Sequence, residues 1–204
     1  MQNGKILIAD DDAMIRLDLR AMLESLGHCV VAEAEDGERA CYLARSLKPD
    51  LLILDVMMPK KNGLEVAEIA CRERLGAVML LTAYSEAPII EQASRIGVLA
   101  YLVKPFRQQE LQPAIEIALS RYREMSALEG ALDAAQNQIE ASRQIGRAKR
   151  ILMDRHSISD QEAYRRLQSQ ALASNHSLRE IADAILLTEN MGAMTAPAET
   201  RKNR

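Results

Sequence analysis

The sequence predicts a doubly wound α/β domain followed by a helical C-terminal part. Within residues 1–122, five short apolar runs alternate with segments of helical periodicity. The runs are continuously apolar, which is typical of strands that are buried on both faces of a parallel sheet. Beyond residue 122 the helical periodicity continues without another β-like run. We therefore expect five βα units and then helices only.

The predicted strands span residues 6–10, 29–34, 51–55, 77–82 and 100–103. The first intervening helix is predicted to end at Gly27, and the second to stop before Pro49, because these residues break helices. The pattern favours a flavodoxin-like, five-stranded parallel sheet. In that strand order the first and third strands are neighbours, so their carboxyl ends lie side by side.

Residues 123–145 are predicted to form a helical linker. Its apolar residues follow heptad spacing: Met125, Leu128, Leu132, Ala135 and Ile139. This seam covers about two heptads, whereas a secure coiled coil needs about three to four. Two interpretations remain open, namely a linker helix that self-associates as a short coiled coil and an amphipathic helix that packs on its own domain.

Residues 146–190 are predicted to form a small all-α domain of three short helices. The first begins beyond Gly146, and capping boxes at residues 159–162 and 177–180 begin the second and third. Three helices in so short a segment make a marginal core, so we expect the domain to lean on the linker helix or on a dimer partner. The composition of residues 191–204 predicts a disordered tail.

The charge of the chain is unevenly distributed. The net charge is -3, but residues 143–180 hold eight Lys or Arg against four Asp or Glu, so this segment is +4 and the remainder is -7. A basic module beside an acidic domain is a candidate for binding a polyanion, although most charge clusters are only solvated helix faces. The candidate contacts are Arg143, Arg147, Lys149, Arg150, Arg155, Arg165 and Arg166.

Composition also excludes several classes of protein. No stretch approaches the roughly 18–20 apolar residues that a membrane span needs, and the N-terminus lacks the pattern of a signal peptide. We therefore expect a cytoplasmic protein without a membrane partner. The cysteines, Cys29, Cys41 and Cys71, lack metal or disulfide spacing and are expected to be buried small hydrophobes.

Acidic residues follow two of the predicted strands. Asp10 and Asp11 end the first strand, Asp12 follows them, and Asp55 ends the third. Carboxylates gathered in one pocket repel one another, and a hard divalent cation such as Mg²⁺ relieves the repulsion. Helix capping is the alternative explanation, and it suits Asp12, but it does not account for Asp55 on a separate strand.

Two further polar residues lie at the ends of the fourth and fifth predicted strands. Thr82 ends the fourth strand with a hydroxyl group, and Lys104 follows the fifth with a cation that can pair with a carboxylate or a phosphoryl oxygen. Singly these are weak signals. Acids, a hydroxyl and a lysine at the ends of four strands together predict a phosphate site.

Four motifs resemble those of two-component response-regulator receiver domains: IADDD at 8–12, LDVMMP at 54–59, LTA at 81–83 and YLVKPF at 101–106. The resemblance covers residues 5 to 122 and implies a receiver domain at 1–122. It implies that Asp55 is the phosphoacceptor and that Asp11 binds Mg²⁺ directly. Asp10 would support the waters of the metal, and the Met57 main-chain carbonyl would be a further ligand.

The same resemblance implies a phosphoryl-sensing pair, Thr82 and Lys104, and a switch residue, Tyr101. It also implies a cis peptide between Lys104 and Pro105. The implied reaction is phosphoryl transfer from a phosphohistidine of a sensor histidine kinase to Asp55. The chain would catalyse this transfer to itself and would not be a metabolic enzyme.

Residues 147–153 (RAKRILM), with Ser159, residues 162–164 (EAY) and several apolar positions up to Ala182, resemble the ANTAR output domain of transcription antiterminators. Arg150 departs from the pattern, since the family usually has Gly there. The resemblance implies binding to a structured RNA, such as a hairpin in a nascent transcript. Separately, the heptad spacing of the linker predicts a homodimer that forms on phosphorylation.

Two alternative outputs remain open from the sequence. The last three helices could form a DNA-binding helix-turn-helix. The third of these helices holds only one basic residue, Arg179, which equips it poorly for the major groove. The C-terminal part could instead be a dimerisation or protein-interaction module that binds no nucleic acid.

Overall fold

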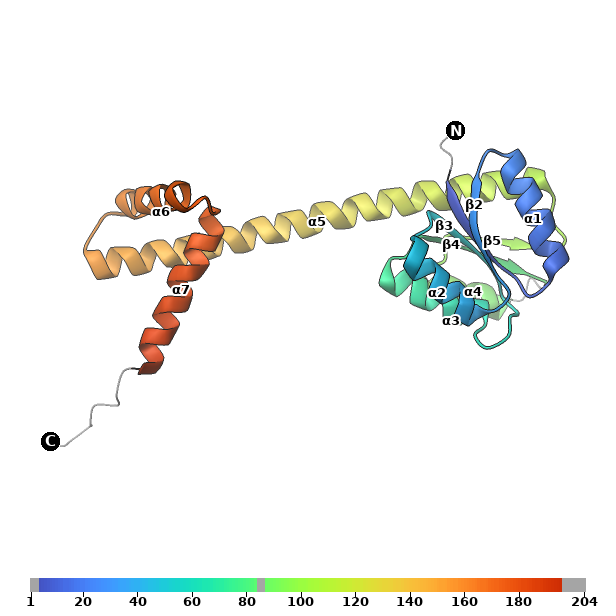
Figure 1. Cartoon of the computed structure of the whole chain (residues 1–204), viewed down its shortest axis with the longest axis horizontal. Coiled ribbons are helices and arrows are strands. Elements are labelled where there is room, and N and C mark those ends of the chain that lie inside the picture. The colour runs from blue at the N-terminus through green and yellow to red at the C-terminus, as the bar shows by residue number, and fades with distance from the viewer. Residues whose placement is uncertain (1–3, 84–86, 196–204) are drawn as a thin grey trace, which may run out of the picture. The chain divides into compact units, whose positions relative to one another are not determined.

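The computed structural model describes residues 4–83 and 87–195, and within them the chain forms five strands and seven helices (Figure 1). The chain divides into two compact units, which we call the α/β unit (Met1–Ala127) and the helical unit (Leu128–Arg204). The elements are β1 (Lys5–Ala9), α1 (Ala13–Ser25), β2 (Cys29–Ala34), α2 (Gly37–Leu47), β3 (Leu51–Asp55), α3 (Gly63–Glu73), β4 (Ala77–Thr82), α4 (Ala87–Ile96), β5 (Ala100–Val103), α5 (Gln108–His156), α6 (Asp160–Ser174) and α7 (Leu178–Thr195).

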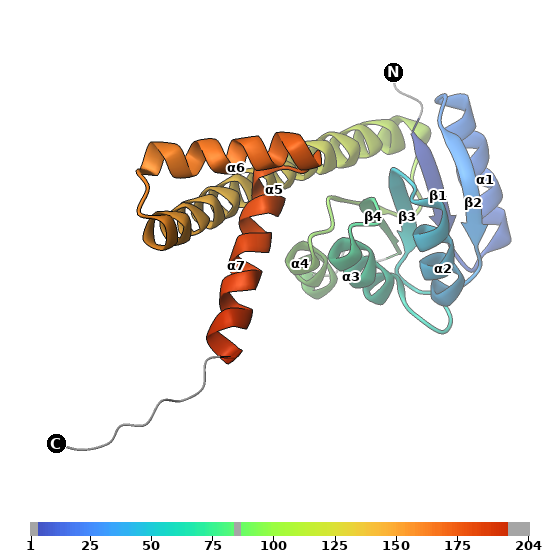
Figure 2. The same cartoon turned by 60° about the vertical axis from the view of Figure 1, so that its left-hand side comes forward.

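The five strands form one parallel sheet in the order β2-β1-β3-β4-β5, which confirms the predicted flavodoxin-like fold. Helices α2, α3 and α4 cover one face of the sheet, and α1 and the first part of α5 cover the other (Figures 1 and 2). Alternate residues of each strand enter the two cores, because successive side chains of a strand point to opposite faces. The central strands are therefore apolar on both sides.

Local signals in the sequence begin the helices beside the sheet edge. The Asp12 carboxylate accepts a hydrogen bond of 2.8 Å from the Met14 N–H, which confirms the capping role of Asp12. Helix α3 begins with a capping box between Asn62 and Glu65. A Cβ atom on Gly63 would lie 2.1 Å from the Asp55 carbonyl oxygen, so only glycine lets α3 begin this close to the end of β3.

One continuous helix, α5, spans 49 residues. The expected separate helix beyond Gly146 is therefore wrong, since it is the last part of α5. A Cβ atom on Gly130 or Gly146 would meet nothing within 4 Å, so these glycines meet no packing need. Each costs about 0.5–1 kcal/mol relative to Ala in a helix, a cost that the neighbouring helix formers offset.

The helical unit is built on a small core. Ala148 of α5, Leu167 of α6 and Ala182 of α7 are buried against one another. Helix α6 lies along the last part of α5, and α7 crosses it (Figures 1 and 2). The predicted capping at 159–162 and 177–180 is present, with a single bond to Ser159 at the start of α6 and reciprocal bonds between Ser177 and Glu180 at the start of α7.

Two expectations about the chain are corrected. Helix α7 continues through residues 191–195, which were expected to be disordered, while residues 196–204 lie outside the described residues. Cys41 is buried and Cys71 partly buried, but Cys29 is exposed because it begins the edge strand β2. In the part of the chain that the structure describes, no helix is both long and apolar enough to cross a membrane.

Candidate functional site

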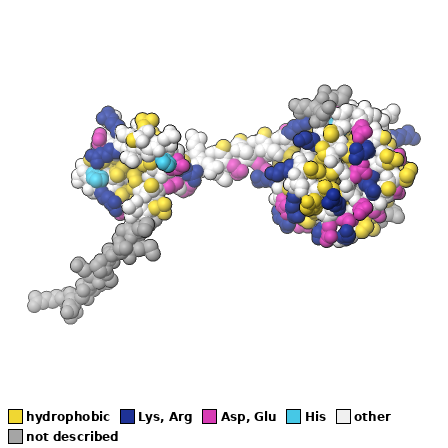
Figure 3. Space-filling model, in the orientation of Figure 1, with side chains coloured by type: hydrophobic (Ala, Val, Ile, Leu, Met, Phe, Trp, Pro, Cys, Tyr) yellow, Lys and Arg dark blue, Asp and Glu magenta, His cyan; other side chains and the backbone are white. Residues whose placement is uncertain are grey.

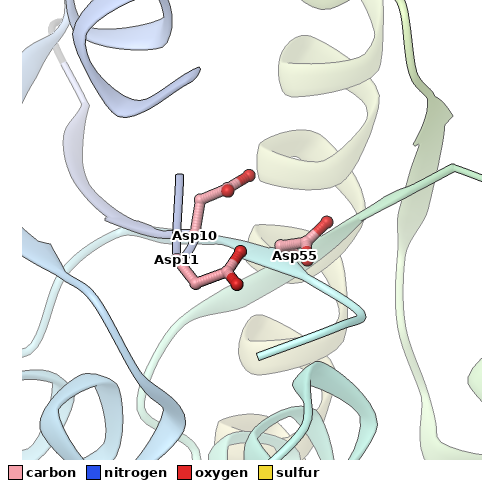
Figure 4. A group of neighbouring side chains, drawn as sticks. All are labelled: Asp10, Asp11 and Asp55. Atoms are coloured by element: carbon pink, nitrogen blue, oxygen red, sulfur yellow. The ribbon is translucent and has the colours of Figure 1, made fainter. Parts of the chain in front are cut away.

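Three carboxylates meet at the carboxyl edge of the sheet. One oxygen from each of Asp10, Asp11 and Asp55 lies within 4.8 Å of the others. Figure 4 shows Asp10 and Asp11 leaving the end of β1 beside Asp55 at the end of β3. Asp10 and Asp55 are buried, whereas Asp11 is exposed. The parallel pairing of β1 with β3 brings these residues together, as the predicted strand order requires.

Lys104 bridges two of the acids. Its Nζ lies 2.6 Å from Asp10 Oδ2 and 2.6 Å from Asp55 Oδ1, and its side chain is only 17% exposed. Burial raises the pKa of Asp55, and the neighbouring Asp10 raises it further, while the hydrogen bond from Lys104 lowers it. One ammonium group cannot neutralise three carboxylates. Their hard oxygen donors fit a divalent cation such as Mg²⁺.

The loop after β1 is held by an arginine that the sequence reasoning missed. Arg16 Nη1 donates to the Asp10 carbonyl oxygen at 2.7 Å and to the Asp11 carbonyl oxygen at 3.3 Å. Glu33 of β2 lies 3.5 Å from Arg16 Nε. The helix dipole disfavours a cation near the N-terminus of a helix. An arginine in the first turns of α1 was therefore a signal in the sequence that it has a specific partner.

The structure places the other predicted residues of this edge as follows. The Met57 N–H donates to Asp55 Oδ2 at 2.9 Å, and the Met57 side chain is exposed. Thr82 is buried at the end of β4, and its carbonyl accepts from the Lys104 N–H at 2.8 Å. Tyr101 of β5 is 48% exposed. The peptide between Lys104 and Pro105 is cis, as expected.

Two of the basic residues that were predicted to bind RNA form ion pairs between helices of the helical unit. Lys149 Nζ lies 2.6 Å from Asp160 Oδ1, and 5.8 Å from the centre of the Tyr164 ring. Arg155 pairs with Glu189. These two ion pairs connect α5 with α6 and α5 with α7, so both cations stabilise the packing of the three helices.

The other five predicted contacts lie on different sides of the helical unit. Three arginines of α5 are exposed and form no ion pair with any described residue: Arg143, Arg147 and Arg150. At about 100° per residue they lie away from the buried Ala148. Arg165 and Arg166 on α6 share Glu162, at 4.0 and 3.7 Å. Figure 3 shows Lys and Arg around the rim of this unit, with hydrophobic side chains between them.

A five-stranded parallel sheet in this order, with buried acids and a lysine at its carboxyl edge, defines the receiver class of α/β domains. Residues 6–116 match the family model described as "Response regulator receiver domain", and residues 133–186 match the "ANTAR domain". The chain belongs to the response regulators that join a receiver domain to an ANTAR domain.

Known proteins agree with this membership. The chain is similar to the transcriptional regulatory protein PdtaR of Mycobacterium tuberculosis, with 39% identity over 184 residues and 90% of each chain covered. Among solved structures, the receiver domain of the response regulator NarL from Mycobacterium tuberculosis is 28% identical with a TM-score of 0.56, and 59% of this chain and 98% of that chain are covered. A receiver domain from Desulfovibrio desulfuricans is 27% identical with a TM-score of 0.57, covering 61% of this chain and 99% of that one.

Membership defines the kind of regulator. The chain is a two-component regulator of the ANTAR type, in which a receiver domain implies a sensor kinase as partner and an ANTAR domain implies RNA. The family typically binds Mg²⁺ through its acidic pocket, and the cluster of Asp10, Asp11 and Asp55 supplies that pocket here.

Proposed function

We propose that a sensor histidine kinase phosphorylates this protein on Asp55 and that the protein then acts as an RNA-binding transcription antiterminator. The observation that carries the first part is the buried Asp55 carboxylate, held by Lys104 beside two further acids. The ANTAR match and the +4 charge of residues 143–180 support the second part. The proposed domains are a receiver at 1–122, a linker at 123–145 and an RNA-binding domain at 146–190.

The proposed reaction is an in-line phosphoryl transfer. An oxygen of the Asp55 carboxylate forms a bond to phosphorus while the bond between phosphorus and the kinase histidine nitrogen breaks, and the electron pair stays on that nitrogen. Lys104 orients the carboxylate through its 2.6 Å contact. Asp10, Asp11, Asp55 and the Met57 carbonyl would hold Mg²⁺, which would neutralise charge on the phosphoryl group.

The proposed switch uses residues of β4 and β5. The Thr82 hydroxyl would bind a phosphoryl oxygen, and Tyr101 would rotate from its half-exposed position into the space that Thr82 leaves. The phosphoryl group would make different contacts in the two conformations of this surface. It would therefore shift the equilibrium between them. We place the readout of the switch on α5, because this helix begins after β5 and continues into the helical unit.

The proposed output is a stabilised RNA hairpin that keeps a competing terminator from forming. The chain has no Trp and one Phe, so phosphate and 2′-hydroxyl contacts to a folded RNA suit it better than aromatic platforms for single strands. The proposed contacts are the seven basic residues, with Lys149 and Arg155 having the additional packing role. We place this activity in the cytoplasm.

Labelling tests the phosphorylation. Incubation with acetyl phosphate and Mg²⁺ is expected to add one acid-labile phosphoryl group, which Asp55→Asn abolishes and Asp11→Asn greatly slows. Asp12→Asn is the matched control, since it removes a neighbouring charge but keeps a good helix cap. Undiminished labelling of the Asp55→Asn protein would refute the assignment.

A gel-shift comparison tests the output. The phosphorylated protein is expected to retard structured RNA more strongly than duplex DNA of equal length, with an affinity that falls as salt rises. Preference for the duplex DNA would instead make the protein a DNA-binding regulator. Binding to neither would leave a protein-interaction output.

A further inference from the structure

A hollow of about 720 Å³ lies within the helical unit, where α6 turns into α7. Ala171, Leu172 and Leu178 form its apolar part. Leu172 is 84% exposed although the neighbouring Ala171 is buried in the core. A single exposed leucine needs no explanation, but one that lines a concave surface beside polar groups is typical of a binding site.

The polar part of the hollow consists of neutral hydrogen-bonding groups and one cation. Gln168, Asn175 and His176 line it together with Arg165, and no carboxylate is among its described lining residues. His176 Nδ1 lies 2.7 Å from the Ser174 carbonyl oxygen. Because a carbonyl can only accept, this contact requires a proton on Nδ1 and leaves Nε2 of the neutral ring as an acceptor.

Arg165 is free enough to meet an anion. Its side chain is 68% exposed, and the nearest Glu162 oxygen is 4.0 Å from its Nη1. An exposed pair of this length stabilises little, so exchanging Glu162 for a phosphate costs little. Arg166 shares the same carboxylate but does not line the hollow.

We propose that this hollow, the base pocket, binds one unstacked base of an RNA loop, an inference that rests on the proposed RNA-binding function. Leu172 and the His176 ring would contact the base face. The amides of Gln168 and Asn175 would bond to its edge, as these side chains do with bases, and Arg165 would bind the adjacent phosphate. The pocket volume lies in the range of small-ligand sites. The single cation, Arg165, beside the amides of Gln168 and Asn175 favours a nucleotide over a purely apolar protein surface.

The probe is a pool of RNA hairpins with one fixed stem and a randomised loop, from which the wild-type protein selects its ligand. Leu172→Ala is expected to weaken binding of the selected hairpin about 10-fold, because the apolar contact with the base is lost. The salt slope is expected to stay unchanged, because no charge is lost. Arg165→Gln is expected to lower the salt slope by about 0.7–0.9. The matched controls are Leu187→Ala, which is exposed outside the pocket, and Arg179→Gln, which removes an exposed cation that neither lines the pocket nor belongs to the proposed RNA contacts.

Loop nucleotides without a base complete the test. One such abasic hairpin is expected to bind wild type about 10-fold more weakly, and Leu172→Ala is expected to weaken it no further, because the two changes remove the same contact. Gln168→Ala gives a second variant, and circular dichroism establishes that each variant is folded.

The outcomes separate two failures. If the wild-type protein enriches no hairpin, the proposed RNA-binding function and the base pocket both fall. If it enriches one, but Leu172→Ala and Gln168→Ala bind it as tightly as wild type, only the base pocket is overturned. The pocket is also overturned if Leu172→Ala changes the mass of the protein in light scattering, because the hollow would then be an interface between copies.

Discussion

Burial raises the pKa of Asp55 above its ordinary value of 3.8. The raised pKa means that the ionised carboxylate is less favourable in the folded chain than in the unfolded chain. This penalty is fully present above the raised pKa, and it disappears as the pH falls through the raised pKa toward 3.8. The ionised Asp55 therefore reduces stability near neutral pH in the absence of a cation.

Asp55→Asn is predicted to raise the melting temperature of the α/β unit in the metal-free protein near neutral pH, because the amide removes the buried charge. The expected rise is about 2–4 °C, which corresponds to ~1 kcal/mol in a chain of this size. The difference from wild type is expected to shrink as the pH falls, and thermal melts over a pH series measure it. A lower melting temperature for Asp55→Asn at every pH would mean that the bond to Lys104 outweighs burial. Asp12→Asn is the exposed control.

Arg16 acts on the acids through their backbone, since it bonds to the carbonyls of Asp10 and Asp11. Arg16→Ala is predicted to weaken Mg²⁺ binding about 10-fold, the lower end of the effect of removing groups that support metal ligands. Titration calorimetry measures it, and Arg16→Lys should restore part of the affinity. Arg20→Ala is the control, because Arg20 bonds to Glu33 without touching the acidic loop. Equal affinities for Arg16→Ala and wild type would contradict the role.

At the scale of the element, α5 carries an exposed apolar seam. Leu128 is 73% exposed, Leu132 58% and Ile139 55%. These residues belong to none of the buried clusters of the described chain, and both alternatives for the linker stay open. An exposed seam at heptad spacing suits a second copy of the same helix.

We predict that phosphorylation raises the dimer content and that Leu132→Glu abolishes this rise, because it places a charge in the apolar seam. Ala134→Glu is the matched control, since it adds the same charge on the opposite side of the helix. Light scattering of the phosphorylated proteins measures the mass. A Leu132→Glu protein that dimerises like wild type would remove the linker seam from the mechanism.

At the scale of the whole molecule, the two units differ in the size of their cores. The α/β unit has two large clusters of buried residues on the two faces of its sheet, whereas the described part of the helical unit has one cluster of three buried residues, Ala148, Leu167 and Ala182. Since buried apolar area is the main source of stability, the units should differ in their resistance to heat.

Thermal unfolding is predicted to show two transitions, with the helical unit melting first. Mg²⁺ should raise only the upper transition, because a ligand stabilises the unit that binds it. A selected RNA hairpin should raise only the lower one. Scanning calorimetry with each ligand separately measures both shifts. A single transition that both ligands raise would mean that α5 couples the units into one cooperative structure.

Much of the α/β unit followed from the sequence. The continuous apolar runs predicted all five strands, and the residues that end them predicted which side chains share the site. The capping residues Asp12, Ser159 and Ser177 marked helix starts because their side chains bond to backbone groups only a few residues away. The sequence reasoning took Gly146 as a break, but a single glycine inside a helix costs only about 1 kcal/mol. The helix-forming residues on both sides offset this cost, so α5 continues through Gly146.

The sequence by itself determined the parallel sheet, the acidic cluster with Lys104, and the family, because these depend on periodicity and on residues placed at strand ends. Only the tertiary structure decided the partners of single side chains. Arg16 reaches the acidic loop, Lys149 packs α6 against α5, and Leu172 lines a hollow. Each of these arrangements depends on how the elements pack in the folded chain. Local patterns record the period of an element, whereas such contacts arise from the packing of whole elements, which no short stretch of sequence encodes.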